Sequence, residues 1–319
     1  MKPSIIWTVK RNNMLGISTC WWFNRVSGGE EIVSDIVELG LKGVELEYRM
    51  SHAVFKQMKR QLRKVLRVLT IHNFFPIPEG IPPDKASGDL FLLSSTDRDE
   101  RSKAVRYSIR TIEHAHELGA RAVILHLGRV DMPNPAQDFL RLHRSGKIGE
   151  KEGLAFVKEQ KLIREASKKK NLDAVLLSLE KLNREAERRG IFLGIENRYH
   201  FHEIPDLEEI GLILRKFKGG NIRYWHDVGH AMAQENMGLI RQRDLLETYS
   251  DEMIGIHLHD VRGVDDHLAP GQGEVDYSQI RPFMKPSIIT VLEVHSKVRR
   301  KALLEGIRFV TTVISQSNQ

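Results

Sequence analysis

Eight short apolar segments alternate with longer stretches of helical pattern along this chain. The apolar segments are residues 15–18, 43–48, 68–72, 122–128, 191–197, 222–225, 254–256 and 288–294. Between them, apolar residues recur three and four positions apart, as on one face of a helix. The clearest such stretches are 31–39, 54–66, 97–118, 172–189, 207–217 and 297–313. This alternation predicts a parallel sheet, and eight units favour a single closed (β/α)8 TIM barrel over an open sheet.

Three segments fall outside this pattern. Residues 1–13 precede the first strand and are predicted to be an N-terminal extension, so that the barrel spans residues 14–319. Residues 74–96 contain four prolines and form a loop by composition. Residues 129–171 are polar and mixed in charge, which predicts a partly helical insertion after strand four. Loops of such length are usually functional or disordered, so either segment is a candidate lid.

Composition narrows the class of protein. The chain has 319 residues, which suits one barrel with insertions. The single cysteine, Cys20, excludes an intramolecular disulfide and favours a reducing cytoplasm. No apolar run approaches the roughly 20 residues of a membrane span, and no secretory signal is evident. We therefore expect a cytoplasmic protein that does not associate with membranes.

The formal charge of +7 favours an anionic partner, either a sugar phosphate or a nucleic acid. Much of the excess lies in two helical stretches, 56–67 and 158–170. Lys and Arg in such stretches more often form a solvated helix face than a nucleic-acid groove. Nucleic-acid binding is therefore kept as the less favoured alternative.

Histidines and carboxylates follow most of the predicted strands. His72, His126, Glu196, Asp227 and His257 end strands three to seven, and Glu293 lies late in strand eight. In a barrel these ends meet at one mouth, where active sites lie. A single histidine at a strand end is more often structural, but buried carboxylates in such a group need a cation among them. The sequence therefore predicts a divalent-metal site, with zinc, manganese or cobalt as the candidate ions.

Further candidates lie near these strand ends. His230 follows Asp227 by three residues and can face the same mouth, whereas Asp265 and His267 lie two apart in an extended stretch, which predicts that both face one side. His226 and His259 should point elsewhere and support their neighbours. The candidates for substrate binding are Glu47, Arg198, His202 and Arg262. An ordinary polar loop explains Arg198 and His202 equally well, and Arg262 could instead pair with Asp260.

Several motifs resemble the xylose-isomerase-like TIM barrels, which include endonuclease IV and many sugar or sugar-phosphate isomerases and epimerases. The motifs occur in the family's order, and the resemblance runs from about residue 14 to 313. They are Ile-Glu-Asn at 195–197, His-Asp-Val-Gly-His at 226–230, His-Leu-His-Asp at 257–260, Asp-Asp-His at 265–267, Pro-Gly-Gln-Gly at 270–273 and Leu-Glu at 292–293.

The resemblance implies a site and a reaction. Glu196, Asp227, His257 and Glu293 match the ligands of the metal that the superfamily shares. In the epimerases, the glutamates that match Glu196 and Glu293 also exchange protons with the carbon next to a carbonyl, through an enediolate. We therefore expect a metal-dependent isomerase or epimerase of a small sugar or sugar phosphate. A homo-oligomer is compatible with the sequence.

The comparison with endonuclease IV implies an alternative with three zinc ions. The first would be held by His72, His126 and Glu196, the second by the four ligands above, and the third by His230, Asp265 and His267. Such a centre suits a phosphoesterase that acts on DNA or on a small phosphoester. The continuation at 197–202 and the insertion at 129–171 depart from that enzyme, which favours the isomerase. Another metal-dependent lyase or hydrolase, or a binding protein without catalysis, stays open. One to three ions are therefore expected.

Overall fold

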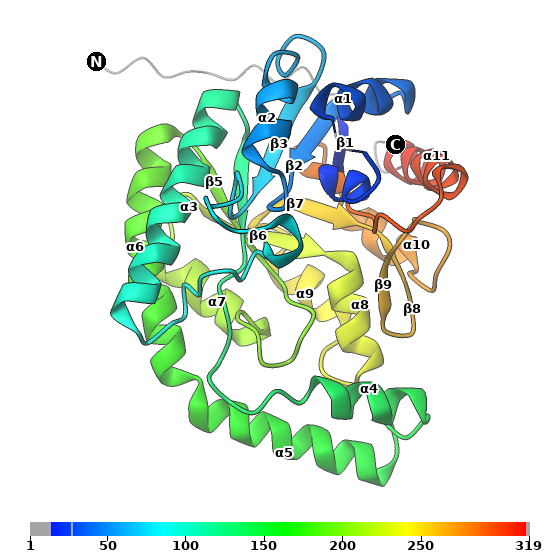
Figure 1. Cartoon of the computed structure of the whole chain (residues 1–319). Coiled ribbons are helices and arrows are strands. Elements are labelled where there is room, and N and C mark those ends of the chain that lie inside the picture. The colour runs from blue at the N-terminus through cyan, green and yellow to red at the C-terminus, as the bar shows by residue number, and fades with distance from the viewer. Residues whose placement is uncertain (1–13, 27, 317–319) are drawn as a thin grey trace.

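Eight parallel strands close into a barrel in the computed structural model, which describes residues 14–26 and 28–316 (Figure 1). In chain order the strands are β1 Leu15–Ser18, β2 Gly43–Leu46, β3 Arg67–His72, β4 Ala122–Leu125, β5 Phe192–Glu196, β6 Ile222–Asp227, β7 Met253–Leu258 and β10 Ile289–Leu292. Strand β1 pairs with β10 and closes the barrel. The predicted barrel and its eight strands are confirmed. The predicted extension, residues 1–13, lies outside the described residues.

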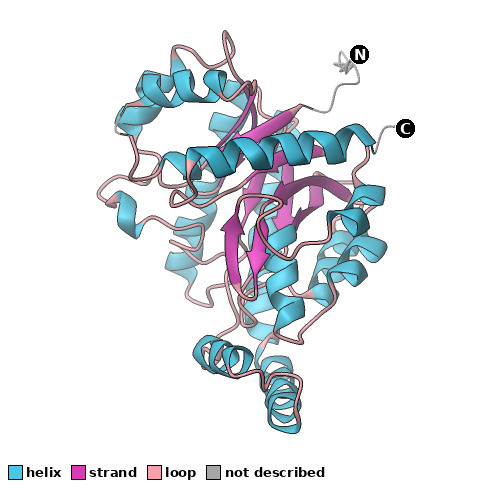
Figure 2. Cartoon of the chain, turned by 90° about the vertical axis from the view of Figure 1, so that its right-hand side faces the viewer, coloured by secondary structure: helices cyan, strands magenta, loops and turns pink. Residues whose placement is uncertain are grey.

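Helices surround the barrel on its outer side (Figures 1 and 2). They are α1 Gly29–Glu38, α2 His52–Lys59, α3 Arg98–Leu118, α4 Ala136–Arg144, α5 Lys151–Ser167, α6 Lys169–Arg189, α7 Leu207–Lys216, α8 Val228–Asn236, α9 Gln242–Tyr249, α10 Tyr277–Ile280 and α11 Arg300–Gln316. The predicted helix at 54–66 is shorter than expected: α2 ends at Lys59, and Arg63, with a φ of 72°, is incompatible with a helix that continues to residue 66. The pattern did not reveal α8 and α9.

Local sequence signals explain the best-predicted helix. The side chain of Asp97 caps α3 by accepting hydrogen bonds from the backbone N–H groups of Asp99 and Glu100. Gly119 ends the helix with a φ of 69°, a conformation that glycine adopts without strain. The apolar positions between them face the barrel, and Ile112 and Ala115 are fully buried. Helix α3 thereby covers β3 and β4.

The segment after β4 forms two helices, α4 and α5, before the chain returns to the barrel through α6. In Figures 1 and 2 both helices lie at the lower edge, away from most of the strands. Phe139 and Val157 form a small core with Ala233 of α8 and with Met237, which directly follows that helix. The insertion therefore packs against the loops at one edge of the barrel.

Arg164 of α5 ties this insertion to the loop after β5. Its side chain is almost fully buried and donates hydrogen bonds to the carbonyls of Phe201, at 3.0 Å, and Glu203, at 2.9 Å. Both carboxylate oxygens of Glu209 accept hydrogen bonds from the same guanidinium, at 2.8 and 2.9 Å. The loop that follows Glu196 is therefore held at both its backbone and its helical end.

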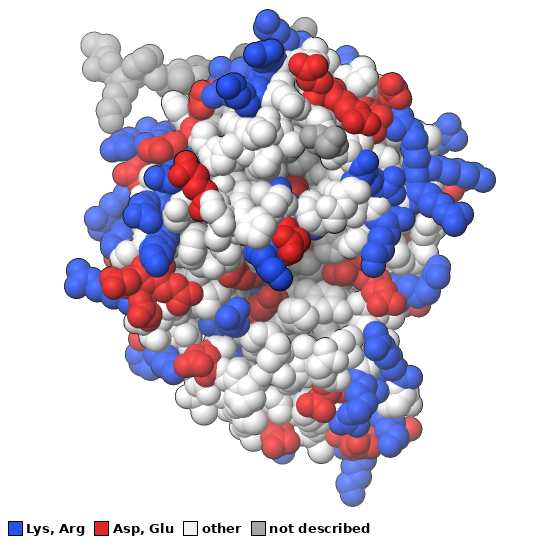
Figure 3. Space-filling model, in the orientation of Figure 1, with Lys and Arg blue, Asp and Glu red and all other residues white. Residues whose placement is uncertain are grey.

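Positive charge is spread around the face of the molecule in Figure 3 and is not gathered at its centre. Lys and Arg side chains lie mostly toward the rim of the face in Figure 3, and no continuous basic stripe crosses the described residues that it shows. Within the described part of the chain, no helix combines the length and apolar character needed to cross a membrane. The basic helical stretches thus fit solvated faces on this side of the molecule.

Candidate metal centre

Three carboxylates and one imidazole meet at the mouth of the barrel. His257 Nδ1 lies 2.7 Å from Glu196 Oε1, 3.0 Å from Glu293 Oε2 and 3.5 Å from Asp227 Oδ2. Asp227 and His257 are register partners on the adjacent strands β6 and β7, so their side chains leave the sheet together. We call Glu196, Asp227, His257 and Glu293 the strand-borne cluster. All four are buried.

The charge of this cluster calls for a cation. Three buried carboxylates around one imidazole would repel one another strongly in a medium of low polarity. Burial alone would raise the pKa of Glu196, but hydrogen bonds with His126 and His257 hold that pKa well below its usual value. Burial would also raise the pKa of Glu293, but the nearby His257 and His267 outweigh this effect and lower that pKa. The donor set, three ionised carboxylates and an imidazole nitrogen, fits a divalent metal ion.

Glu45 orients His257, and the first turn of α8 orients Asp227. His257 Nε2 lies 3.0 Å from Glu45 Oε2, which also accepts a hydrogen bond of 2.8 Å from the hydroxyl of Thr70. Burial alone would lower the pKa of His257, but Glu293 and Glu45 raise it well above its usual value. Asp227 caps helix α8 by accepting from the N–H of His230, at 2.7 Å. Carboxylates that hold ligand imidazoles in this way fix their orientation.

His259 supports Asp227 from the other side, as expected for a histidine beside the ligands. Its Nε2 lies 2.9 Å from Asp227 Oδ1, and its Nδ1 accepts a hydrogen bond from the backbone N–H of His267. His226 is buried and its Nδ1 lies 2.7 Å from the hydroxyl of Tyr224. His259 therefore contacts the cluster through Asp227, whereas His226 pairs with Tyr224 instead.

A second group lies beside the first and shares one ligand with it. His72, His126 and Glu196 place nitrogen and oxygen atoms within 4.8 Å of one another, and we call them the imidazole-pair cluster. His126 Nε2 lies 3.2 Å from Glu196 Oε2, and its Nδ1 lies 2.9 Å from Asp89 Oδ2. His72 Nδ1 lies 3.1 Å from the carbonyl of Asn73, which leaves its Nε2 as the ligand atom.

Arg198 enters this second group. Its Nη1 donates to Glu196 Oε2 at 2.9 Å, and its Nη2 lies 3.2 Å from both Asp89 Oδ2 and Glu203 Oε1. The residue was expected at the lining of a substrate pocket, but only 5% of its side chain is exposed. Sequence reasoning missed Asp89 and Glu203. Asp89 lies in the proline-rich loop, where Gly88 is so close to His126 that a Cβ there would lie 2.6 Å from Nδ1.

A third group combines two residues of a β-hairpin with one residue of α8. Strands β8 Asp260–Arg262 and β9 Asp265–Leu268 pair beside the barrel. His267 Nδ1 lies 3.0 Å from Asp266 Oδ2, and His230 Nε2 lies 3.8 Å from the same oxygen. We call His230, Asp266 and His267 the hairpin cluster.

This third group corrects a prediction. Asp265 was expected to face the same side as His267, but Asp265 is exposed and the neighbouring Asp266 joins the cluster instead. His267 adopts a φ of 56°, which breaks the two-residue alternation on which the prediction rested. In the structure Asp266, and not Asp265, lies beside His230 and His267.

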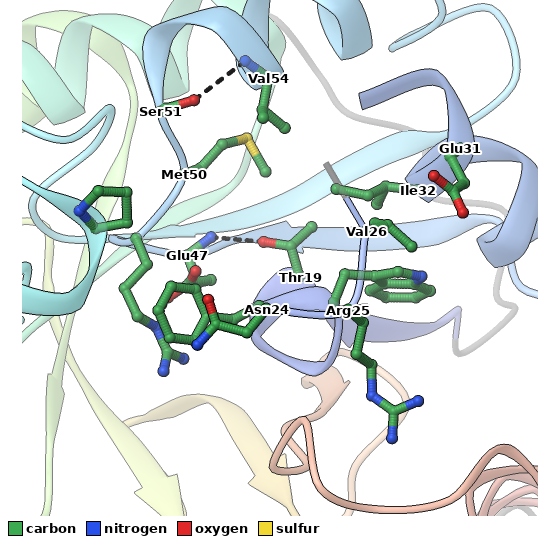
Figure 4. Close-up of a pocket in the computed structure, with 14 residues that line it drawn as sticks. Thr19, Asn24, Arg25, Val26, Glu31, Ile32, Glu47, Met50, Ser51 and Val54 are labelled. Carbon is green, nitrogen blue, oxygen red and sulfur yellow. Dashed lines mark hydrogen bonds and ion pairs between the residues drawn. The ribbon is translucent and has the colours of Figure 1, made fainter. Parts of the chain in front are cut away.

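Glu47 lies apart from the three clusters. It lines a cavity of about 520 Å³ together with Thr19, Trp22 and Arg49 (Figure 4). Its Oε2 lies 2.8 Å from Arg49 Nε. Burial raises the pKa of Glu47 against the opposing effect of Arg49, and Glu293 lies near enough to raise it further. None of the four residues of the strand-borne cluster lines this cavity.

His202 and Arg262 also lie apart from the clusters. His202 is buried in the loop after β5. Arg262 is exposed and donates to the carbonyl of Gln272. Its expected alternative partner, Asp260, instead accepts hydrogen bonds from backbone N–H groups, including that of Gly271.

The fold and the site define a class of protein: TIM barrels with carboxylates and imidazoles clustered at the mouth. The comparison with known families agrees with this class. Residues 33–312 match the family described as xylose isomerase-like TIM barrel, and the chain belongs to that family. None of the curated proteins matches the sequence.

Solved structures share the fold at low identity. An L-ribulose 3-epimerase superposes with a TM-score of 0.67 at 15% identity, covering 96% of each chain. A 3-keto-D-glucoside 4-epimerase from E. coli gives a TM-score of 0.66 at 15% identity, covering 94% of this chain and 100% of its own. The IOLI protein with a bound zinc atom gives 0.63 at 12% identity, covering 95% and 99%. Sugar epimerases, and a zinc-bound protein, are therefore among its structural neighbours.

Proposed function

We propose that this chain is a divalent-metal-dependent isomerase or epimerase of a sugar or sugar phosphate. The observation that carries the proposal is the convergence of Glu196, Glu293 and Asp227 on His257 Nδ1. Such a buried donor set suits zinc, manganese or cobalt. The names of the similar structures, two of them sugar epimerases, support the same reaction class.

The strand-borne cluster would hold the ion. When bound, the ion would supply Lewis-acid polarisation of substrate oxygens. Glu196 and Glu293 would move the proton. Glu196 is the last residue of β5 and Glu293 directly follows β10, and β6 and β7 separate these two strands in the barrel, so the two carboxylates approach the centre from different sides. One carboxylate can remove a proton from the carbon next to the carbonyl, and the other, once protonated, can return a proton to the opposite face.

The remaining residues of the mouth would bind and orient the substrate. Glu47 and Arg49 offer an acceptor and a donor at the edge of the cavity, an arrangement that suits sugar hydroxyls. His230 lies in the first turn of α8, beside Asp227, where its Nε2 can reach a substrate oxygen. The buried position of the carboxylates excludes bulk water from the reacting carbon.

Solvent isotope exchange tests the proposal. Protein loaded with manganese, cobalt or zinc is incubated in D2O with a panel of ketoses and their phosphates, and deuterium next to the carbonyl is measured by NMR. We expect incorporation with the wild-type chain and its loss with Glu196→Gln and Glu293→Gln, with Glu252→Gln, at an exposed position just before β7, as a surface control. Full incorporation by both glutamine variants would refute the assignment.

A second candidate is a multinuclear phosphoesterase. Glu196 belongs to two clusters at once, and the hairpin cluster adjoins Glu293, since His267 Nε2 lies 3.8 Å from Glu293 Oε2. Clustered ions suit phosphodiester cleavage. Three zinc ions per chain, together with nicking of DNA that contains an abasic site, would favour this candidate over the epimerase.

A further inference from the structure

The strand-borne and imidazole-pair clusters share Glu196 but differ in the charge beside it. Glu196 Oε1 faces His257, whereas Glu196 Oε2 faces both His126, at 3.2 Å, and the guanidinium of Arg198, at 2.9 Å. Arg198 is charged at every accessible pH. One side of the shared carboxylate therefore faces the other ligands, and the opposite side already carries a cation.

Arg198 cannot easily move out of this position. Its Nη2 lies 3.2 Å from Asp89 and Glu203, and its carbonyl accepts a hydrogen bond from Gln234 at 2.6 Å. The backbone of the same loop is anchored by Arg164 at two carbonyls. Movement of the guanidinium would also take a positive charge away from the buried Glu196 and the partly buried Asp89 and Glu203.

We propose that Arg198 is a built-in cation that weakens metal binding at the imidazole-pair cluster, so that the first ion occupies the strand-borne cluster. The inference rests on the proposed metal site and refines it. An ion held by His126 and Glu196 Oε2 would lie about 2 Å from that oxygen. The guanidinium would then stand within a few ångströms of the ion, where two positive charges repel strongly because little water screens them. Asp89 and Glu203 reduce this repulsion without removing the charge.

The proposal has a functional consequence. A centre that fills one cluster first supports proton transfer on a small substrate, whereas phosphodiester cleavage uses clustered ions. Arg198 would therefore favour the epimerase at ordinary metal concentrations. Its role is one of tuning metal number, since it touches the ligand Glu196 and not the ion.

Zinc titration of the chelator-treated full chain tests the inference. Calorimetry gives the number of ions and their dissociation constants, and His126→Gln identifies the imidazole-pair site as the one that this substitution removes. Wild-type protein is expected to bind one ion tightly and to fill the imidazole-pair site much more weakly. Arg198→Gln should tighten that site at least about ten-fold, in the range by which neighbours of metal ligands change affinity. The double variant with His126→Gln should lose the gain.

Matched variants separate charge from packing. Arg198→Lys keeps the positive charge and should leave the imidazole-pair site weak, and Arg49→Gln, which removes another arginine of the mouth, should leave it unchanged. Should Arg198→Gln fail to fold, Glu203→Gln tests the same point, because a less screened guanidinium should weaken the site further. Equal wild-type affinities at both clusters, or no tightening in Arg198→Gln with no weakening in Glu203→Gln, would overturn the inference. Absence of any bound ion in every variant would instead refute the proposed function.

Discussion

The strand-borne cluster and the hairpin cluster hold similar groups in different ways. The ligands of the first come from four barrel strands or their ends, and their side chains are between 0 and 9% exposed. The hairpin cluster takes His230 from the first turn of α8 and Asp266 and His267 from the hairpin, and the latter two side chains are 26 and 24% exposed. A barrel strand is fixed by neighbours on both sides, whereas the hairpin pairs only with itself.

This difference predicts unequal metal affinity. Rigid strands hold ligand atoms in place before the ion arrives, and burial strengthens the attraction between carboxylates and the cation. Ligands on an exposed hairpin must be ordered on binding, and water competes for them. We therefore expect the hairpin cluster to bind a given ion more weakly.

Loss of His257 should have the largest effect on this comparison. At an ion concentration about 100 times the dissociation constant, binding stabilises a folded protein by about 2.7 kcal/mol. His257→Gln removes the only nitrogen ligand of the strand-borne cluster and should abolish most of that stabilisation. Urea unfolding with and without zinc measures it. His230→Gln is the control from the hairpin cluster and should keep most of the stabilisation; equal losses in the two variants would contradict the ranking.

Glu45→Gln should have the next largest effect. Its carboxylate holds His257 Nε2, and loss of such a partner typically weakens metal binding by about 10- to 100-fold. Thr70→Val removes only one hydrogen bond to Glu45 and should cost less, about 1 kcal/mol. Calorimetric titration compares the two. Unchanged affinity in Glu45→Gln would show that the barrel alone fixes the imidazole.

Substitution of Asp265 and of Asp266 tests which of the two carboxylates belongs to the metal site on the hairpin. Asp266→Asn should weaken zinc binding at the hairpin cluster by about ten-fold; His230→Gln, which removes this site, identifies it in the titration. Asp265→Asn should leave the binding free energy within about 0.5 kcal/mol of wild type, because Asp265 is exposed. Both variants change one charge at adjacent positions, so general electrostatics cannot distinguish them. The reverse order of effects in a zinc titration would restore the alternating strand that the sequence predicted.

The contrast between the clusters also explains what could be predicted from the sequence. Site residues at the ends of buried strands could be predicted, because strands that alternate with helices and close into a barrel bring their ends together. Asp227 and His257 are the clearest case. The hairpin was not readable, since a φ of 56° at His267 is a local conformation that no apolar pattern records. Arg198 was recognised as a mouth residue, but its partner Asp89 lies 109 positions away in a loop without periodicity.

A smaller effect should appear in the pH dependence of the metal-free protein. Burial alone would lower the pKa of His267, but Asp266 and Glu293 raise it well above its usual value. The folded chain therefore keeps a proton that the unfolded chain loses near pH 6.5. This stabilisation is complete below that pH and is lost as the pH rises through the folded pKa, with a slope of at most about 1.4 kcal/mol per pH unit for one proton.

The raised pKa of His257 makes the free energy of unfolding depend on pH in the same direction, so only the difference between wild type and Asp266→Asn isolates His267. Urea unfolding after chelation, at pH 7 and pH 8, should show a shallower decline in Asp266→Asn; identical slopes would mean that Asp266 does not hold the proton of His267, and the hairpin cluster would lose the electrostatic coupling that distinguishes Asp266 from Asp265.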